Sequence, residues 1–123
     1  MRGRVCLVTG ATSGIGRVAA RELATKGATV ILVGRSQEKC VATMEEINSV
    51  TGSDALDYFV CDLSNFQQIR TMTLALKRKY SKLNVLVNNA GGQRPFLAAD
   101  MSLEHFEKVI RNNLVGTFAM TQT

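Results

Sequence analysis

Residues 9–16 read Thr-Gly-Ala-Thr-Ser-Gly-Ile-Gly, and this stretch decides the fold. It follows an apolar run at residues 5–8 and leads into a segment with apolar residues at helical spacing. A strand, a glycine-rich turn and a helix in this order form an arrangement that binds phosphate. Gly10 would permit the tight turn, Gly14 would let a pyrophosphate approach the backbone, and Gly16 would allow close helix packing. The alternative interpretation is an ordinary glycine-rich turn.

Four apolar runs alternate with helical patterns along the chain. The first is a continuous apolar run, which is typical of a parallel strand that is buried on both faces. The four runs lie at residues 4–8, 28–33, 55–60 and 83–87. A loop at residues 88–100 follows the last run. This βαβαβαβα order predicts an α/β fold in which right-handed crossovers build a doubly wound parallel sheet with strand order 3-2-1-4.

The helix boundaries are indicated by capping residues and glycines. Gly27 can end the first helix, and Ser36 can cap a second helix that reaches about residue 50. Ser64 and Gln67 form a capping box that would open the third helix. Ser102 can cap a last helix, which would still be running at the final residue.

The composition is that of one soluble globular domain over residues 1–123, with 46% hydrophobic residues. No apolar run reaches the roughly 18 residues of a membrane helix, and we expect a cytoplasmic protein without a targeting segment. The unpaired spacing of Cys6, Cys40 and Cys61 argues against disulfides and against a metal site. The net charge is +5, and its densest cluster, at residues 77–82, falls at a predicted helix end. We therefore favour a solvated surface over nucleic-acid binding.

The end of the second strand carries a basic residue where dinucleotide sites usually bind the adenosine ribose. An acidic side chain there would accept a hydrogen bond from the free 2′-hydroxyl of NAD. Gly34, Arg35 and Ser36 stand there instead, and Arg35 can pair with a 2′-phosphate. Arg17, just after the glycine turn, adds positive charge. We therefore favour NADP over NAD, with a solvated loop residue as the alternative interpretation of Arg35.

Polar residues also follow the third and fourth strands. Asp62 lies at the carboxyl end of the third strand, where adenine would bind in such a sheet, although it could instead cap the region of Ser64. Residues 88–91, Asn-Asn-Ala-Gly, follow the fourth strand at the same edge as the glycine turn. Their two amides offer donors and acceptors, and the small residues leave room for a ligand.

One amide side chain falls on the apolar face of the last predicted helix. Asn113 shares that face with Phe106 and Ile110, so its amide needs hydrogen-bond partners. It could be a satisfied polar group of the core. Gly116 would loosen or bend the same helix.

Together these residues resemble the classical short-chain dehydrogenases/reductases over nearly the whole chain. Residues 9–16 resemble the family's T-G-x-x-x-G-x-G motif, and Asp62 with Leu63 matches its adenine-contacting acid and the following residue. Residues 88–91 resemble the motif that supports the sheet and the adenosine side of the cofactor. Residues 113–116, Asn-Leu-Val-Gly, are similar to the helix motif whose asparagine belongs to the catalytic tetrad.

The resemblance implies a Rossmann-like domain of an NADP-dependent oxidoreductase, which transfers a hydride between nicotinamide and a small carbonyl or alcohol substrate. Arg35 is similar to the basic residue of NADP-preferring members, and Asn113 would be the catalytic residue. A homo-oligomer is implied as well. The implied cofactor-binding residues are Gly10, Thr12, Ser13, Gly14, Ile15, Gly16, Arg35, Ser36, Asp62, Leu63, Asn89, Ala90 and Gly91.

The family's Tyr-x-x-x-Lys motif, and the serine that precedes it, have no counterpart in residues 1–123. Tyr58 lies in a predicted strand, and Tyr80 is followed four residues later by Asn84. The family's tyrosine is the general acid and base. The chain therefore resembles the cofactor-binding half of the domain, with an unpaired edge at the fourth strand. The competing interpretation is a non-catalytic nucleotide-binding or dimerising module, such as a truncated form.

Overall fold

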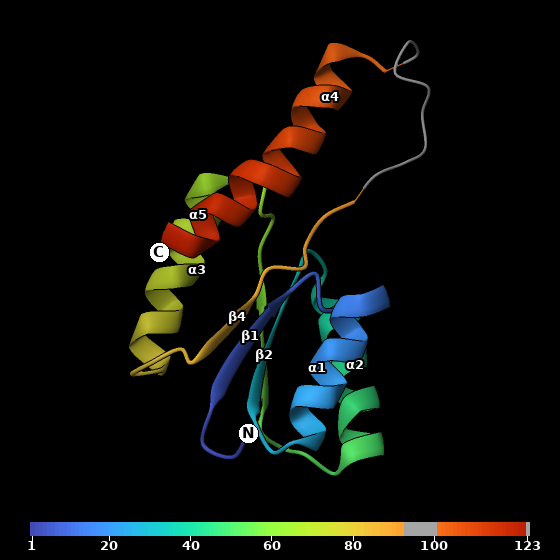
Figure 1. Cartoon of the computed structure of the whole chain (residues 1–123), viewed down its shortest axis with the longest axis vertical. Helices are drawn as coiled ribbons and strands as arrows, with labels where there is room; N and C mark the ends of the chain where they lie inside the picture. Colours follow the sequence, from blue (N-terminus) through green and yellow to red (C-terminus); the bar gives the residue numbers. More distant parts are fainter. Residues whose placement is uncertain (93–100, 123) are drawn as a thin grey trace.

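A four-stranded parallel sheet forms the centre of the molecule (Figure 1). The structure is a computed structural model and describes residues 1–92 and 101–122. The order β3-β2-β1-β4 confirms the predicted doubly wound topology. Within the described part of the chain, β4 pairs with β1 alone, so its other edge is open there. The strands are β1 (Val5–Thr9), β2 (Thr29–Gly34), β3 (Leu56–Val60) and β4 (Val85–Val87).

Both faces of the sheet are covered by helices, as the mainly apolar runs require. Successive strand residues point to opposite faces, so Cys6 and Val8 belong to one buried cluster and Leu7 to the other. The first cluster is covered by helices α1 (Gly14–Thr25) and α2 (Gln37–Thr51). The second is covered by α3 (Phe66–Lys79) and by Met120 of the last helix.

The second helix begins where the sequence predicts. Ser36 is the N-cap of α2, and its hydroxyl accepts a hydrogen bond from the Lys39 N–H at 3.3 Å. The first helix also ends near the predicted glycine: α1 ends at Thr25, and the Gly27 N–H donates to the Ala24 carbonyl at 2.8 Å.

The start of α3 differs from the predicted capping box of Ser64 and Gln67. Asn65 is the N-cap, and its side-chain oxygen accepts a hydrogen bond from the Gln68 N–H at 3.1 Å. The Ser64 hydroxyl and N–H instead donate to Asp62 Oδ1, at 2.7 and 3.0 Å. The prediction was wrong because the Asp62 carboxylate, two residues earlier, takes the hydroxyl that would have capped the helix.

The last helix is interrupted by a π-helical segment. It begins as α4 (Leu103–Ile110) with Ser102 as the predicted N-cap, continues as η2 (Arg111–Val115) and ends as α5 (Gly116–Gln122). The distortion expected near Gly116 is therefore a π-helical segment that ends just before this glycine. A Cβ at Gly116 would overlap the Leu63 carbonyl oxygen, so the glycine lets the helix approach the segment after β3. Most of the expected loop, with Pro95, and the final Thr123 lie outside the described residues.

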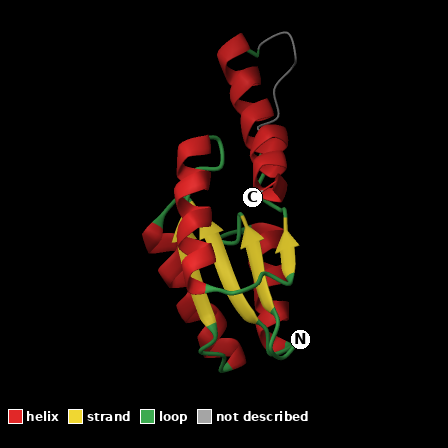
Figure 2. Ribbon diagram, turned by 90° about the vertical axis from the view of Figure 1, so that its left-hand side faces the viewer, coloured by secondary structure: helices red, strands yellow, loops and turns green. Residues whose placement is uncertain are grey.

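The carboxyl ends of all four strands lie at one end of the molecule. Figure 2 shows the strands pointing toward the end from which the last helix rises. At this edge lie the glycine turn after β1, Arg35 after β2, Asp62 after β3 and Asn89 after β4. The topology therefore places most of the predicted site residues together.

Candidate functional site

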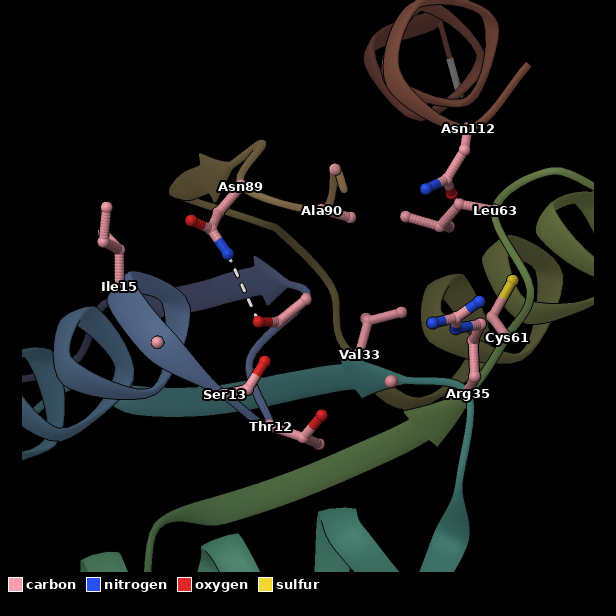
Figure 3. Close-up of a pocket in the computed structure, with 14 residues that line it drawn as sticks. Thr12, Ser13, Ile15, Val33, Arg35, Cys61, Leu63, Asn89, Ala90 and Asn112 are labelled. Carbon is pink, nitrogen blue, oxygen red and sulfur yellow. Dashed lines mark hydrogen bonds between the residues drawn. The ribbon is translucent and has the colours of Figure 1, made fainter. Parts of the chain in front are cut away.

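A pocket of about 530 Å³ opens at the carboxyl edge of the sheet (Figure 3). Its walls come from the glycine turn, the ends of β2 and β3, the segment after β4 and the π-helical segment. Ten of the predicted site residues line it, whereas Gly16, Ser36, Asp62 and Asn113 do not. The lining residues are Gly10, Thr12, Ser13, Gly14, Ile15, Val33, Gly34, Arg35, Cys61, Leu63, Asn89, Ala90, Gly91 and Asn112.

Close packing of backbone explains two of the three glycines in the turn. Gly10 has a φ of 62°, and a Cβ there would lie 2.9 Å from the Ala90 Cα. A Cβ at Gly16 would overlap both the Gly10 carbonyl oxygen and the Asn89 amide nitrogen. Both positions therefore require glycine because the turn, α1 and the segment after β4 meet there.

The N-terminus of α1 faces open space at the remaining glycine of the turn, Gly14. Ser13 is the N-cap, but its side chain makes no capping hydrogen bond, and the first turn contains no acidic residue. A Cβ at Gly14 would meet nothing within 4 Å. The first N–H groups of a helix carry a partial positive charge and have no partner within the helix. This end of α1 therefore fits a phosphate group, in both charge and space.

Thr9 holds the glycine turn and the segment after β4 together. Its side chain is buried, and its hydroxyl accepts hydrogen bonds from the N–H groups of Asn89 and Ala90, at 3.0 and 2.9 Å. The same hydroxyl donates to the Val87 carbonyl at 3.3 Å. Thr9 is not among the site residues predicted from the sequence. The sequence did contain a signal, because a threonine at the end of a buried strand needs hydrogen-bond partners for its hydroxyl.

Asn89 supports the turn rather than pointing its donors into the pocket. Its amide nitrogen donates to the carbonyl oxygens of Thr9 and Gly10, at 3.1 and 3.2 Å; Figure 3 draws the second bond. These bonds satisfy two carbonyl groups where β1 ends and the chain turns. The amide side chain therefore shapes one wall of the pocket.

Arg35 lies where three pockets meet. It is exposed at the end of β2 and lines the main pocket and two smaller pockets, of about 390 and 430 Å³. The 390 Å³ pocket also contains Ser36, whose hydroxyl caps α2. A guanidinium here can reach an anion bound beside the glycine turn.

Asp62 lies in the 430 Å³ pocket, beside Arg35 and Lys108, and not in the main pocket. Hydrogen bonds from Ser64 hold the pKa of its carboxyl below the usual range, and the charges of Arg35 and Lys108 lower it further. Asp62 therefore does organise the segment around Ser64, which was the alternative interpretation. Its neighbour Leu63 reaches the main pocket.

Asn113 forms a closed pair of hydrogen bonds with the segment after β4. Its amide nitrogen donates to the Gly92 carbonyl at 3.2 Å, and its oxygen accepts from the Gly92 N–H at 2.9 Å. A Cβ at Gly91 would lie 2.6 Å from the same oxygen, so this glycine permits the approach. Asn112, the neighbour of Asn113 that was not predicted from the sequence, lines the main pocket.

Two further groups bear on the chemistry of the site. Cys61 is buried at the pocket wall, and burial together with the negative charge of Asp62 raises its pKa to about 11. The thiol therefore stays protonated at neutral pH. Tyr80 lies at the other end of β3, where its hydroxyl donates to Asp57 at 2.7 Å. Tyr58 packs under α1 and α2, so neither tyrosine lines the main pocket.

Two features are absent from the described residues. No group of three or more His, Cys, Asp or Glu side chains there is arranged to hold a metal ion. None of the helices in that part of the chain is both long and apolar enough to cross a membrane.

Known proteins are similar to this chain in sequence and in fold. The chain is 38% identical over 122 residues to a 3-oxoacyl-(acyl-carrier-protein) reductase of Thermotoga maritima, which covers 99% of the chain and 49% of the relative. A structure of an actinorhodin polyketide ketoreductase with NADPH matches with a TM-score of 0.90 and 34% identity, over 99% of this chain and 47% of that one. A 3-ketoacyl-(acyl-carrier-protein) reductase from Brucella melitensis, complexed with NADH, matches with a TM-score of 0.86 and 30% identity, over 98% and 48%.

The family model described as short chain dehydrogenase matches residues 4–123. The chain spans about half the length of the curated relatives that it matches. A doubly wound sheet, a glycine turn that leaves the N-terminus of α1 open, and this match over nearly every residue lead to one assignment. The chain belongs to the short-chain dehydrogenase family.

Proposed function

We propose that residues 1–123 form the NADP-binding part of an oxidoreductase that acts on a small carbonyl or alcohol. One observation carries the choice of cofactor: Arg35 borders both the pocket at the N-terminus of α1 and a second pocket rich in cations. A pyrophosphate beside Gly14 and a 2′-phosphate beside Arg35 would then be bound from the same edge of the sheet. The relatives include proteins solved with NADPH and with NADH, so family membership alone leaves this choice open.

The cofactor would supply the hydride, and the residues of this chain would bind and orient it. The proposed binding set is the one named from the sequence, with Asn112 added. Thr9 and Asn89 hold the glycine turn in place, and Leu63 and Val33 provide apolar walls. Asn113, proposed as the catalytic asparagine, is positioned by its two bonds to Gly92.

Equilibrium binding of NADPH and NADH tests this proposal. Arg35→Asp should weaken NADPH binding by at least tenfold, because it removes a phosphate partner and adds a repulsive charge, a difference of about 1.4 kcal/mol or more. NADH binding should change little, because NADH has no 2′-phosphate. Lys26→Asp, at the opposite end of α1, makes the same change of charge outside the pockets. Equal loss of both cofactors in Arg35→Asp would contradict the assignment.

A non-catalytic nucleotide-binding module is the second candidate. It is favoured by the positions of the two tyrosines, because neither lines the pocket and Tyr80 is bonded to Asp57. Burial, together with that bond and the Asp57 charge, raises the pKa of Tyr80, which makes it a poor general base at neutral pH. NADPH-dependent carbonyl reduction by the chain itself, abolished by Asn113→Ala, would exclude this candidate.

A further inference from the structure

A second pocket, of about 390 Å³, adjoins the main pocket between α1 and α2. The two helices lie side by side on one face of the sheet (Figure 1). Thr12, Ser13 and Arg35 belong to both pockets, so an anion could extend from one into the other. The pocket is lined by Thr12, Ser13, Arg17, Arg35, Ser36, Lys39, Ala42, Thr43 and Glu46.

Positively charged side chains outnumber negatively charged ones in the lining of this pocket. Arg17, Arg35 and Lys39 are cations, and Glu46 is the one carboxylate among its lining residues. A phosphate monoester carries close to two negative charges at neutral pH. The pocket therefore suits such a group, and Glu46 is the lining residue that would repel it.

Glu46 also holds one of the three cations. Arg17 Nη1 donates to Glu46 Oε2 at 3.3 Å, which links α1 to α2 in the lining of the pocket. The two side chains are 47% and 44% exposed, so the ion pair is solvated and weak. An exposed pair of this kind can be exchanged for another anion without rebuilding the fold.

We propose that Glu46 is a specificity-determining residue that limits how strongly this pocket selects a 2′-phosphate. The carboxylate acts in two ways: it occupies Arg17, and it places a negative charge near the incoming phosphate. Removal of that charge should release Arg17 toward the ligand and strengthen binding of the phosphorylated form alone. The inference rests on the proposed role of Arg35 as a 2′-phosphate ligand and extends it to a residue of the α1–α2 pair.

The test uses two small probes, 2′,5′-ADP and 5′-AMP, which differ by the 2′-phosphate. Dissociation constants are measured by calorimetry for the wild-type chain and for Glu46→Gln, Arg17→Gln and the double variant. Glu45→Gln is the matched control, because Glu45 is exposed on the same helix, carries the same charge and does not line the pocket. Circular dichroism establishes that each variant is folded.

Glu46→Gln should bind 2′,5′-ADP about three- to fivefold more tightly at low salt, which is the scale of one exposed charge near a phosphate. Binding of 5′-AMP should be unchanged, and Glu45→Gln should match the wild type. When Arg17 is already replaced, the Glu46→Gln change should give a smaller gain, and the part of the gain that is lost would measure the contribution of the released Arg17.

Two results would overturn the inference while the NADP assignment stands. In the first, the wild-type chain prefers 2′,5′-ADP, and Glu46→Gln leaves that preference unaltered or weakens it. In the second, Glu45→Gln tightens the binding of 2′,5′-ADP as much as Glu46→Gln does. A wild-type chain that binds both probes equally would overturn the NADP assignment and this inference with it. The two failures are therefore distinguishable in one set of measurements.

Discussion

Asn113 and Gly92 exchange two hydrogen bonds, in which the amide side chain donates to the carbonyl at 3.2 Å and accepts from the N–H at 2.9 Å. The two residues are 21 positions apart, and the pair joins the π-helical segment to the chain after β4. One side chain thus satisfies both polar backbone groups of Gly92. The pair fixes how the last helix meets the pocket.

The first prediction concerns this pair. Asn113→Ala should lower the free energy of unfolding by about 1–2 kcal/mol, because it leaves two backbone groups of Gly92 without their partner. Urea denaturation measures the change. Asn112→Ala, on the same turn and lining the pocket, is the matched control and should alter nucleotide binding more than stability. A loss of stability that is the same in both variants would contradict the role assigned to the pair.

The second prediction concerns the Thr9 hydroxyl. Thr9→Val keeps the shape of the side chain but removes the acceptor of the Asn89 and Ala90 N–H groups. We expect a loss of about 1–2 kcal/mol in the free energy of unfolding, since two partly buried donors lose their acceptor. Thr9→Ser retains the hydroxyl and should recover most of this loss. If Thr9→Ser and Thr9→Val prove equally unstable, the methyl group and not the hydroxyl is responsible.

The third prediction separates backbone strain from binding at the glycine turn. Gly14 and Gly3 have φ values of 52° and 71°, and a Cβ at either would meet nothing within 4 Å. Gly14→Ala and Gly3→Ala should therefore each cost about 1 kcal/mol of stability from strain alone. Only Gly14→Ala should also weaken NADPH binding, because its methyl group would occupy the space assigned to the phosphate. Parallel melting curves and binding titrations measure both effects.

The fourth prediction concerns acid. Burial would raise the pKa of Asp57, but hydrogen bonds from Lys79 and Tyr80, each 2.7 Å long, hold it below its ordinary value. A lowered folded-state pKa adds stability above the unfolded pKa of about 3.9, and that stability is lost as the pH falls through the folded value. Asp57→Asn should therefore be less stable than the wild type near pH 7, and the difference should narrow by about pH 3. Urea midpoints at the two pH values measure it, and an undiminished difference at low pH would refute this explanation.

The strands and their order were predictable because each strand comes from a short, mainly apolar run that alternates with helical patterns. The fourth run begins at residue 83, but β4 begins at Val85, because Asn84 uses its side chain to accept the Val5 N–H at 2.9 Å. The predicted capping box at Ser64 does not form, because the Ser64 hydroxyl donates to the Asp62 carboxylate instead. Local propensity could not decide between two partners for one hydroxyl.

The site was predictable where it follows the ends of strands and less so where it depends on contacts between distant residues. Arg35 and the glycines follow directly from strand ends. The partner of Asn113 lies 21 residues away, and the π-helical register brings Asn112 to the pocket wall. Neither follows from helical periodicity, because the π-helical segment changes which residues share a face.

The Thr9 hydroxyl has a consequence for the motions of the molecule. Because one buried oxygen holds the amides of Asn89 and Ala90, the glycine turn and the chain after β4 should open together or not at all. Hydrogen exchange at these two amides should then follow unfolding of the whole sheet, while the uncapped amide of Ile15 exchanges freely. A bound nucleotide would slow exchange at Ile15 far more than at Ala90, so one spectrum would distinguish contact with the ligand from the scaffold that supports it.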